Sequence, residues 1–556
     1  MIKLLFLTLY MAIGFSHGDD AGERSLPLKI KPSFAGTYGE LRSGRFHAGF
    51  DFRVGGVVGE PIYSIGDGYI SRITVTSTGY GNGLYITHPD GTVSIYGHMH
   101  EFAPEIAQFV EKRQYENESF NVNIVLKPEE FPVEMGQFIG KVGNSGSSAA
   151  PHLHFEVRRP DDAGPVNVAY QDYFKYEDNV PPVIEKVNFY SFEDSTGVVQ
   201  SELIRSFRGS SSKVLEVSDK FYVAVDAHDR QAGTPGKLGL EVYEFFLDGE
   251  SVFRYGTGEY TYKEKETFNA LIDYRERVRS GDALIKSYVE PGNGFKRKIT
   301  AVNRGIFSLT DNDVHSVKVV VEDLHGNKKF ATFKVRRGAS AGDTLRYDRA
   351  IPWFAPYAFA KKGVKVSLPV MSLFRSEAIE IDTVSVGGKF YSKVWRIHNP
   401  EVPLKKEGVV EIDVENLPDS LQSKAFLGYL TDGGRVSYCG GKYKDGVMRG
   451  RLSSFGMYCV GIDTEGPKIK PRFSSLRTIQ RSGQMAFTIK DDCSGIGSFR
   501  AEIDGEWVLA QFDKKFDKLW IVLDPERVKR GCSHELVLKV KDNRDNVSTY
   551  KYKFKW

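Results

Sequence analysis

Turn-forming residues recur at roughly every eight to twelve positions along almost the whole chain, and this spacing constrains the fold most strongly. Examples are Gly66–Gly68, Pro89–Gly91, Asp248–Gly249 and Asp504–Gly505. The runs between these turns are short and rich in Val, Ile, Tyr, Phe and Thr, residues that suit the pleated surface of a strand. We therefore predict a mainly β protein, in which the clearest helical segment is Pro104–Gln114.

Two segments of the chain begin and end alike, which indicates related domains. Pro182-Val183-Ile184 and Pro467-Lys468-Ile469 each follow a turn that contains Asp, and the stretch 321–327 resembles the stretch 540–546. Each stretch leads into a final alternating strand. We interpret both segments as immunoglobulin-like β-sandwiches, and the first is long enough to carry an insertion.

The length of 556 residues also requires several domains, because one hydrophobic core rarely organises so many. The predicted boundaries are a signal peptide at 1–18, a compact antiparallel β domain at 28–176, an immunoglobulin-like domain with an insertion at 181–338, a β-rich domain of no identified type at 339–464, and a second immunoglobulin-like domain at 465–556.

The N-terminus has the three parts of an export signal. Lys3 supplies a positive charge, Leu4–Phe15 is an almost unbroken apolar run, and Ser16-His17-Gly18 offers small residues for cleavage. No Cys follows the run, so a lipoprotein anchor is not expected. No later segment is apolar enough to span a membrane, so we expect an exported protein with no integral membrane segment after signal removal.

Charge and cysteine content exclude other classes of function. The formal net charge of +3 is nearly neutral for this length, so no nucleic acid partner is expected. The four cysteines contain no Cys-x-x-Cys pair, which argues against a thiolate metal site. Their proximity along the chain suggests the disulfides Cys439–Cys459 and Cys493–Cys532, although four cysteines allow three connectivities.

Three segments of the first domain combine an apolar face with a face of metal-ligand residues. In 46–54 the alternation of a strand would place His47 and Asp51 on one side, with Gly49 between them leaving room for a metal or substrate. In 151–158 the same alternation pairs His152 with His154.

The third segment, 93–100, would place Tyr96, His98 and His100 on one face. Five of the 12 histidines of the chain therefore lie in these three segments, which a merely solvated face does not explain. Two His and one Asp suit zinc, leaving one position for water, and a further His could take a proton or stabilise an oxyanion. We predict a metal site on this surface.

The motifs of this domain resemble the lysostaphin-type (LytM-like, β-lytic) zinc endopeptidases. The matching stretches are His47–Asp51, Tyr96–Met99, Gly143–Gly146 and Pro151–Glu156, together with Gly66–Ile70 and Gly79–Asn82. Their order and spacing agree with the family over about 28–176, roughly a quarter of the chain.

The resemblance implies a role for each matching position. His47, Asp51 and His154 would hold one zinc ion, while His98 and His152 would be the catalytic imidazoles. A groove lined by Tyr80, Asn82, Asn144 and Ser145 would receive the substrate. The family hydrolyses peptide bonds in peptidoglycan, so we expect a hydrolase of stem-peptide crosslinks in the periplasm or cell envelope of a bacterium.

Two departures from the family and two alternative functions remain open. His100 creates a second His-x-His pair, and 101–131 is longer than the family loop, which predicts a flap or helix beside the groove.

The alternative functions are a non-enzymatic envelope scaffold or activator of other wall hydrolases, and a zinc protease acting on proteins. In either case the β-sandwiches could join an envelope protein complex.

Overall fold

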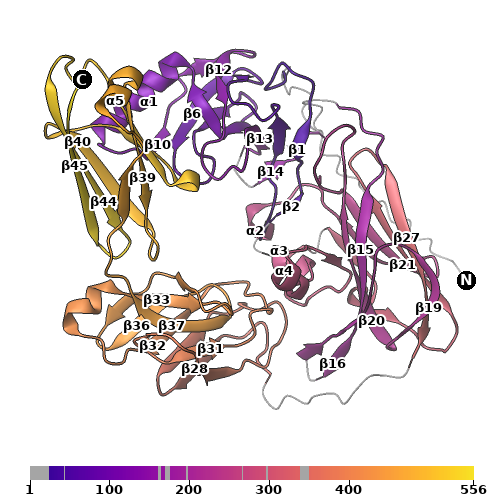
Figure 1. Ribbon diagram of the computed structural model, residues 1–556. Coiled ribbons are helices and arrows are strands. Elements are labelled where there is room, and N and C mark those ends of the chain that lie inside the picture. The colour runs from indigo at the N-terminus through magenta and orange to yellow at the C-terminus, as the bar shows by residue number, and fades with distance from the viewer. Residues whose placement is uncertain are drawn as a thin grey trace, which may run out of the picture.

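The computed structural model describes residues 24–42, 44–160, 164–169, 176–195, 198–265, 267–295, 298–338 and 350–556. The predicted signal peptide at 1–18 lies outside the described residues. The chain is mainly β, as predicted, and its domains follow one another around a ring (Figure 1). Within the described residues, no helix has the length and apolar character that crossing a membrane requires.

The N-terminal domain is built on a nine-stranded sheet and a three-stranded sheet. The large sheet has the order β1-β4-β13-β8-β7-β6-β10, with β11 and β14 at its margins, and the small one has the order β5-β12-β9. The strands are β1 (Phe34–Gly36), β2 (Leu41–Arg42), β3 (Arg45–Phe46), β4 (Phe50–Arg53), β5 (Pro61–Tyr63), β6 (Gly68–Val75), β7 (Gly83–Thr87), β8 (Val93–Gly97), β9 (Met99–Phe102), β10 (Val122–Val125), β11 (Pro132–Val133), β12 (Phe138–Val142), β13 (His152–Arg158) and β14 (Pro165–Val166).

Strand β13 runs between β4 and β8 and divides its side chains between two environments. Leu153, Phe155 and Val157 are fully buried in the core, while His152 and His154 point to the opposite face. His154 lies opposite Asp51 in β4 and opposite Gly97 in β8. The alternation predicted for this strand is therefore confirmed, and it brings the polar residues of two strands together.

The strand predicted over 46–54 is interrupted, which corrects the expected role of Gly49. Strand β3 ends at Phe46 and β4 begins at Phe50, so His47 lies in the connection between them. A Cβ atom on Gly49 would lie 2.2 Å from the carbonyl oxygen of Phe155. Gly49 thus allows β13 to approach closely, rather than leaving room for a metal or substrate.

Replacing Gly49 with Ala is expected to lower the free energy of unfolding by about 3 kcal/mol, because the backbone of β13 must shift. Urea denaturation measures this loss. Gly387→Ala is the control, since a Cβ there meets nothing within 4 Å and should change stability by less than about 0.5 kcal/mol. Equal, small effects at both positions would contradict the close approach.

The segment 93–100 is also broken, and its polar face does not form as predicted. Strand β8 ends at Gly97, and His98 has a backbone φ of 61°, which turns the chain into β9 of the other sheet. Tyr96 is buried beneath the sheet, where its hydroxyl accepts a hydrogen bond from the Ile65 amide. His100 is exposed, so it does not join His98 in a second ligand pair.

The second domain consists of two sheets and an inserted helical segment. Its sheets have the orders β18-β15-β20-β23, with β25 beside β20, and β19-β27-β26-β21-β22-β24. The strands are β15 (Val183–Ser191), β16 (Glu193–Ser195), β17 (Val198–Gln200), β18 (Leu203–Phe207), β19 (Ser211–Val217), β20 (Lys220–His228), β21 (Val242–Leu247), β22 (Glu250–Gly256), β23 (Ile285–Lys286), β24 (Ile299–Ala301), β25 (Phe307–Ser308), β26 (His315–Glu322) and β27 (Lys328–Arg337).

The insertion lies between β22 and β24 and packs against the N-terminal domain. It contains the helices α2 (Tyr262–Lys265), α3 (Phe268–Leu271) and α4 (Tyr274–Ser280). Tyr260, just before α2, stacks on Tyr38 with ring centroids 5.3 Å apart. Phe46 contacts both Tyr260 and Phe268. The two domains therefore share one continuous hydrophobic core.

The last two domains each contain two antiparallel sheets. The third domain pairs β28-β29-β32-β36-β35 with β30-β31-β37-β33-β34, and the fourth pairs β38-β39-β43-β42 with β41-β40-β44-β45. The elements are β28 (Tyr357–Lys361), β29 (Val364–Leu368), β30 (Ile381–Val384), β31 (Val394–Ile397), β32 (Gly408–Asp413), β33 (Ala425–Leu430), β34 (Val436–Tyr438), β35 (Lys442–Lys444), β36 (Val447–Leu452), β37 (Gly456–Ile462), β38 (Lys468–Pro471), α5 (Leu476–Ser482), β39 (Gln484–Lys490), β40 (Ile496–Ile503), β41 (Glu506–Trp507), β42 (Ala510–Asp513), β43 (Lys518–Val522), β44 (Ser533–Asp542) and β45 (Val547–Lys555).

Helix α1 (Pro104–Glu116) is the predicted helix, and it docks the fourth domain onto the first. Tyr115 at its end packs edge-on against Trp507 with ring centroids 5.0 Å apart. Glu118 forms a 2.6 Å ion pair with Arg500 of the fourth domain. The long segment 101–131 thus carries a helix as expected, but its contacts close the ring of domains (Figure 1).

The predicted disulfides are not formed, because all four cysteines are free. Cys439 and Cys459 lie on either side of β33, and two strand spacings of about 4.8 Å exceed the reach of a disulfide. Cys532 precedes β44, whereas Cys493 lies near its other end. A ten-residue strand separates that pair by about 30 Å.

Candidate metal centre and active site

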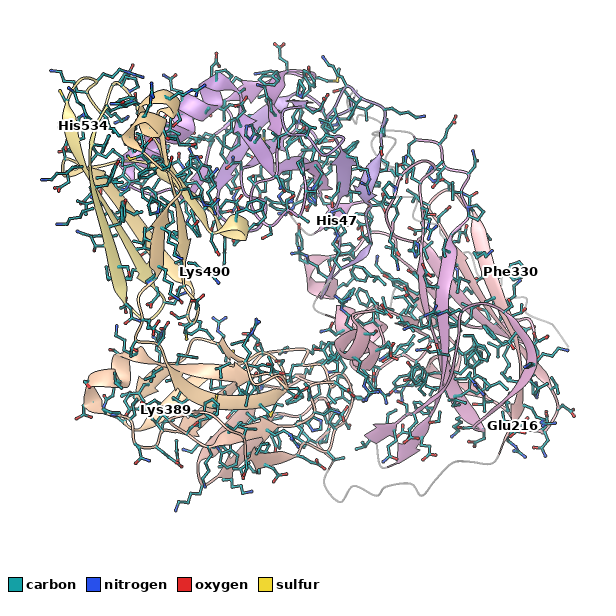
Figure 2. All side chains as sticks on the ribbon, viewed as in Figure 1. His47, Glu216, Phe330, Lys389, Lys490 and His534 are labelled. Carbon is teal, nitrogen blue, oxygen red and sulfur yellow. The ribbon has the colours of Figure 1, made fainter. Side chains whose placement is uncertain are left out.

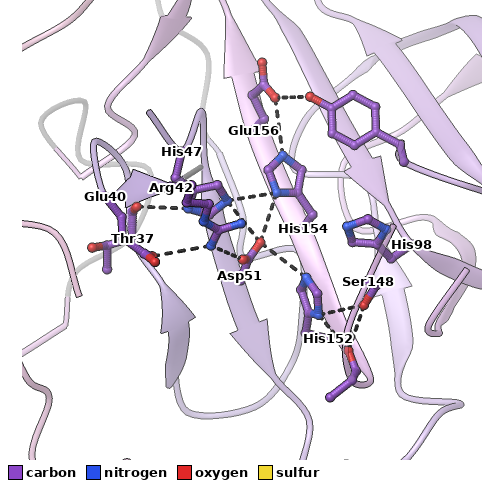
Figure 3. A network of polar contacts seen from close by, with 12 residues as sticks. Thr37, Glu40, Arg42, His47, Asp51, His98, Ser148, His152, His154 and Glu156 are labelled. Carbon is purple, nitrogen blue, oxygen red and sulfur yellow. Dashed lines mark hydrogen bonds and ion pairs between the residues drawn. The ribbon is translucent and has the colours of Figure 1, made fainter. Parts of the chain in front are cut away.

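His47, Asp51 and His154 converge on one point at the face of the large sheet (Figure 3). His154 Nδ1 lies 2.9 Å from Asp51 Oδ1 and 3.1 Å from His47 Nε2. His47 Nε2 also lies 3.1 Å from Asp51 Oδ1. All three residues are at most 5% exposed. The three predicted ligands are therefore brought together, although His47 comes from a connection rather than a strand.

Each imidazole turns a lone pair toward this point because its other nitrogen donates a hydrogen bond elsewhere. His47 Nδ1 donates to the Thr37 carbonyl oxygen at 2.9 Å, and His154 Nε2 donates to Glu156 Oε2 at 3.3 Å. These partners select the tautomers that leave His47 Nε2 and His154 Nδ1 free to accept. Two imidazole nitrogens and a carboxylate oxygen directed at one point could hold a metal ion.

The carboxylate of Asp51 is held from the side opposite the histidines. Arg42 Nη2 contacts Asp51 Oδ2 at 2.5 Å, which leaves Oδ1 directed toward His47 and His154. Arg42 also pairs with Glu40 at 3.4 Å. Burial raises the pKa of Glu40 to about 7, so this second carboxyl competes only weakly for the guanidinium. Sequence patterns did not identify Arg42, Thr37 or Glu40.

The donor set fits zinc. Two imidazole nitrogens and one carboxylate oxygen are preferred zinc ligands, and three protein ligands leave one position for water or substrate. Donor atoms around a tetrahedral zinc ion lie about 3.3 Å apart, close to the spacing seen here. Burial lowers the pKa of His47 to about 4, so its ring is neutral at pH 7.

His154 retains a proton when no metal shares its lone pair. Burial by itself lowers the pKa of His154, but hydrogen bonds to Asp51 and Glu156 outweigh burial and raise this pKa to about 9. Metal binding at Nδ1 would replace that proton with a more highly charged ion. The site therefore holds a positive charge in both states, which is the proton on His154 without metal and the metal ion when one is bound.

Glu156 supports His154 from the next position on the same face of β13. It is fully buried, and Tyr80 donates to its Oε2 at 2.6 Å. Its Oε1 accepts from Arg158 Nε at 2.8 Å and from the Tyr262 hydroxyl at 3.1 Å. Tyr262 belongs to the insertion of the second domain, so that domain completes the surroundings of the metal centre.

Replacing Glu156 with Gln is expected to weaken metal affinity by about 10- to 100-fold, because the amide cannot supply the charge that orients His154. Competition with a chromogenic chelator measures this change. Tyr262→Phe is the matched control, since it removes one of several bonds to Glu156 and should weaken affinity less than tenfold. An unchanged affinity in Glu156→Gln would show that Glu156 does not orient the ligand.

His152 lies beside the three ligand candidates with one nitrogen directed at them. Its Nδ1 donates to the Ala150 carbonyl oxygen at 2.8 Å, with Ser148 Oγ also within 3.2 Å. Its Nε2 lies 3.4 Å from Asp51 Oδ1 (Figure 3). The donating Nδ1 leaves Nε2 as an acceptor next to the centre, which is the position of a proton acceptor.

His98 packs against the same cluster from the turn after β8. Its ring centroid lies 4.9 Å from that of His152 and 6.0 Å from that of His154. His98 Nδ1 donates to the Ser145 carbonyl oxygen at 2.9 Å. Burial, together with the charges of the neighbouring histidines, lowers the pKa of His98 to about 3. His98 is therefore neutral at pH 7.

The predicted groove residues support the site in different ways. Tyr80 and Ser145 hold the site, since Tyr80 stacks 5.1 Å from His154 and Ser145 anchors His98. Ser145 Oγ also donates to the Met99 carbonyl oxygen, and it accepts from the Asn82 amide. Asn144 has a buried side-chain oxygen without a hydrogen-bond partner, and its carbonyl oxygen contacts Lys515 of the fourth domain.

Comparison with known proteins shows the family of the N-terminal domain. The model of peptidase family M23 matches residues 45–115, and the model of a Zu5-like domain matches residues 348–463. The N-terminal region of the chain therefore carries a peptidase M23 domain. The third domain, for which the sequence alone suggested no type, is Zu5-like.

The chain spans about a quarter of the length of the curated relatives that it matches. The DD-carboxypeptidase/endopeptidase Mpg of Neisseria meningitidis serogroup B is 30% identical over 130 residues, which are 23% of this chain and 24% of that relative. The catalytic domain of the antimicrobial peptidase lysostaphin from Staphylococcus simulans is 28% identical, covering 23% of this chain and 79% of that one with a TM-score of 0.17. A zinc containing peptidase from Vibrio cholerae is 27% identical, covering 24% and 31% with a TM-score of 0.17.

Proposed function

We propose that this protein is an exported zinc metalloendopeptidase that hydrolyses peptide bonds in peptidoglycan stem-peptide crosslinks. The observation that carries the proposal is the convergence of His47 Nε2, Asp51 Oδ1 and His154 Nδ1, with His152 Nε2 beside them. The M23 domain and its similarity to a DD-carboxypeptidase/endopeptidase support peptidoglycan as the substrate. Its place of action would be the periplasm or cell envelope.

The proposed metal ligands and their supports have separate tasks. A zinc ion held by His47, Asp51 and His154 would supply Lewis acidity, which acidifies water and polarises a carbonyl group. Thr37, Arg42 and Glu156 orient the three ligands so that their lone pairs meet. This arrangement positions the ligands before substrate arrives, so no reorganisation is needed during the reaction.

His152 is the proposed general base, because its Nε2 accepts protons within reach of the centre. The Ala150 carbonyl fixes the tautomer, and after protonation the same ring can deliver the proton to the leaving amine. The ring of His98 lies next to the ring of His152 in the cluster. His98 would contact the substrate on the side opposite His152. Its low pKa keeps it uncharged, so it does not repel a metal ion.

Mass spectrometry of digested sacculi tests the proposed substrate. The zinc-loaded protein is incubated with purified sacculi and, in parallel, with a panel of folded and unfolded proteins. Release of muropeptides cut within the crosslinks is the expected result, and cleavage of proteins alone would assign a different substrate. No cleavage of any substrate, with sacculi degraded only when a partner hydrolase is added, would indicate a scaffold or activator instead.

A further inference from the structure

Three aspartates meet where the chain enters the second domain, outside the group of metal-ligand candidates in the peptidase domain. Asp178 lies in the segment that enters the domain, Asp229 follows β20, and Asp323 follows β26. One carboxylate oxygen from each lies within 4.8 Å of the others. The three residues are 6%, 5% and 1% exposed, respectively, so their charges are withdrawn from water.

Two carboxylate oxygens of this cluster lack the partners that buried carboxylates normally have. Asp178 Oδ2 and Asp229 Oδ1 are buried without any hydrogen-bond partner. Among the described residues, no Lys or Arg forms an ion pair with any of the three aspartates. Burial and the charges of Asp323 and Asp178 raise the pKa of Asp229 to about 8. A buried, uncompensated carboxylate is costly, and a cation bound beside it would offset that cost.

The fourth domain repeats this arrangement with Asp463, Asp491 and Asp542. Their ligand atoms also lie within 4.8 Å of one another, and Asp542 is 1% exposed. Asp463 lies in the segment that enters the domain, and Asp491 follows β39 as Asp229 follows β20. Ser494 beside this cluster has a buried hydroxyl oxygen without a hydrogen-bond partner.

The contacts of one asparagine in each cluster correspond bond by bond. Asn327 donates from its amide nitrogen to Asp323 Oδ1 at 2.9 Å and from Nδ2 to Asp323 Oδ2 at 2.8 Å. Asn546 makes the same bonds to Asp542 at 2.9 Å and 2.7 Å. Each Asn Nδ2 also donates to the carbonyl oxygen of the entering aspartate, which is Asp178 or Asp463.

We propose that each of these two clusters binds one Ca²⁺ ion. Calcium takes oxygen ligands at about 2.3–2.6 Å, so oxygens that share one ion lie at most about 5 Å apart, as they do here. The clusters offer carboxylate oxygens and no imidazole or thiolate among their three members, which favours a hard cation over zinc. Magnesium demands a stricter octahedral geometry and retains its water, so it fits a buried trio of carboxylates less well.

Both sites lie where one domain joins the next. Asp178 connects the peptidase domain to the second domain, and Asp463 is the last residue of the Zu5-like match. Lys490, the neighbour of Asp491, lies at the end of the fourth domain that faces the third (Figure 2). An ion at each site would tie the entering segment to two loops of its domain and so stiffen the ring of domains.

Equilibrium dialysis of the full-length protein tests the proposal. Protein stripped of metal is reloaded with one equivalent of zinc and dialysed against CaCl₂ from micromolar to 10 mM. Two calcium ions should bind, with dissociation constants of about 0.1–1 mM if these sites resemble extracellular modules. Asp229→Asn and Asp491→Asn should each weaken one site at least tenfold and leave one ion bound. The double variant should bind none.

Two measurements separate loss of binding from loss of folding. Without calcium, the Asn variants should melt no lower than the parent protein, because the substitution removes repulsion between carboxylates. With 10 mM calcium, the parent should melt several degrees higher, while the double variant should not respond. Two exposed aspartates provide control variants, because Asp219 lies at the other end of β20 from Asp229 and Asp492 follows Asp491. Asp219→Asn and Asp492→Asn should still bind two ions.

Two results would overturn the proposal. The first is that the parent protein binds no calcium and shows no thermal response at 10 mM. The second is that the Asn variants bind as much calcium as the parent. An equal response to MgCl₂ at the same concentration would overturn the assignment to calcium. Peptidase activity is not a readout of this experiment, so its outcome is independent of the proposed function.

Discussion

Replacing His47 with Ala is expected to remove zinc and abolish peptidase activity, the largest effect of any substitution discussed here. Structural zinc sites with four protein ligands bind with about 10–16 kcal/mol, so one ligand contributes about 3–4 kcal/mol. Losing His47 Nε2 should therefore weaken zinc binding by several hundredfold. Inductively coupled plasma mass spectrometry measures the bound zinc, and release of muropeptides measures activity.

His100→Ala is the matched control for this experiment. His100 forms a second His-x-His pair with His98, but it is exposed and lies beyond the turn that ends β8. The control should keep one zinc ion and full activity. If His100→Ala lost zinc while His47→Ala retained it, the metal would lie between different histidines and the ligand assignment would be wrong.

Replacing His152 with Ala is expected to leave zinc bound but to lower kcat by about 100- to 10,000-fold, the range for loss of a general base. Zinc should stay bound because His152 Nε2 lies beside Asp51 Oδ1 but is not one of the three ligand atoms.

Zinc content and thermal unfolding distinguish this result from structural damage. His152 is partly exposed, so its truncation should change stability by less than about 1 kcal/mol. Loss of zinc from His152→Ala would place this residue among the ligands. Full activity with zinc retained would exclude His152 as the base.

The residues on β13 were predictable from the sequence because strand alternation is a local property. Leu153, Phe155 and Val157 had to face the core, so His152 and His154 had to share the other face. The same alternation extends to Glu156, whose support of His154 the pattern could have revealed. Asp51 was predicted from alternation over 46–54, and the structure adds that it lies opposite His154 in β13.

Alternation failed where the backbone leaves the extended conformation. His98 has a positive φ and Gly97 ends β8, so the histidines of 93–100 do not share one face. Alternation placed His98 on a shared polar face for the wrong reason, and the resemblance to known peptidases implied its catalytic role. His47 lies in a connection, and its orientation depends on the carbonyl of Thr37, a contact that no periodic pattern encodes.

The remaining supports come from tertiary packing and were not predictable. Arg42 reaches Asp51 from a different hairpin, and Tyr262 reaches Glu156 from another domain. The expected flap at 101–131 instead carries the helix that docks the fourth domain, because Tyr115 finds its partner Trp507 some 390 residues further along the chain. Contacts over such separations depend on how domains assemble, which local sequence does not specify.

Zinc titration of the metal-stripped protein tests the central claim most directly. Increasing amounts of ZnCl₂ are added to the stripped full-length protein, and the release of crosslink-derived muropeptides from sacculi is measured by mass spectrometry. The account predicts no release before zinc is added and activity that rises linearly until one ion is bound at the His47, Asp51 and His154 site. Equal release from the stripped protein, or no release with zinc bound at that site, would contradict it.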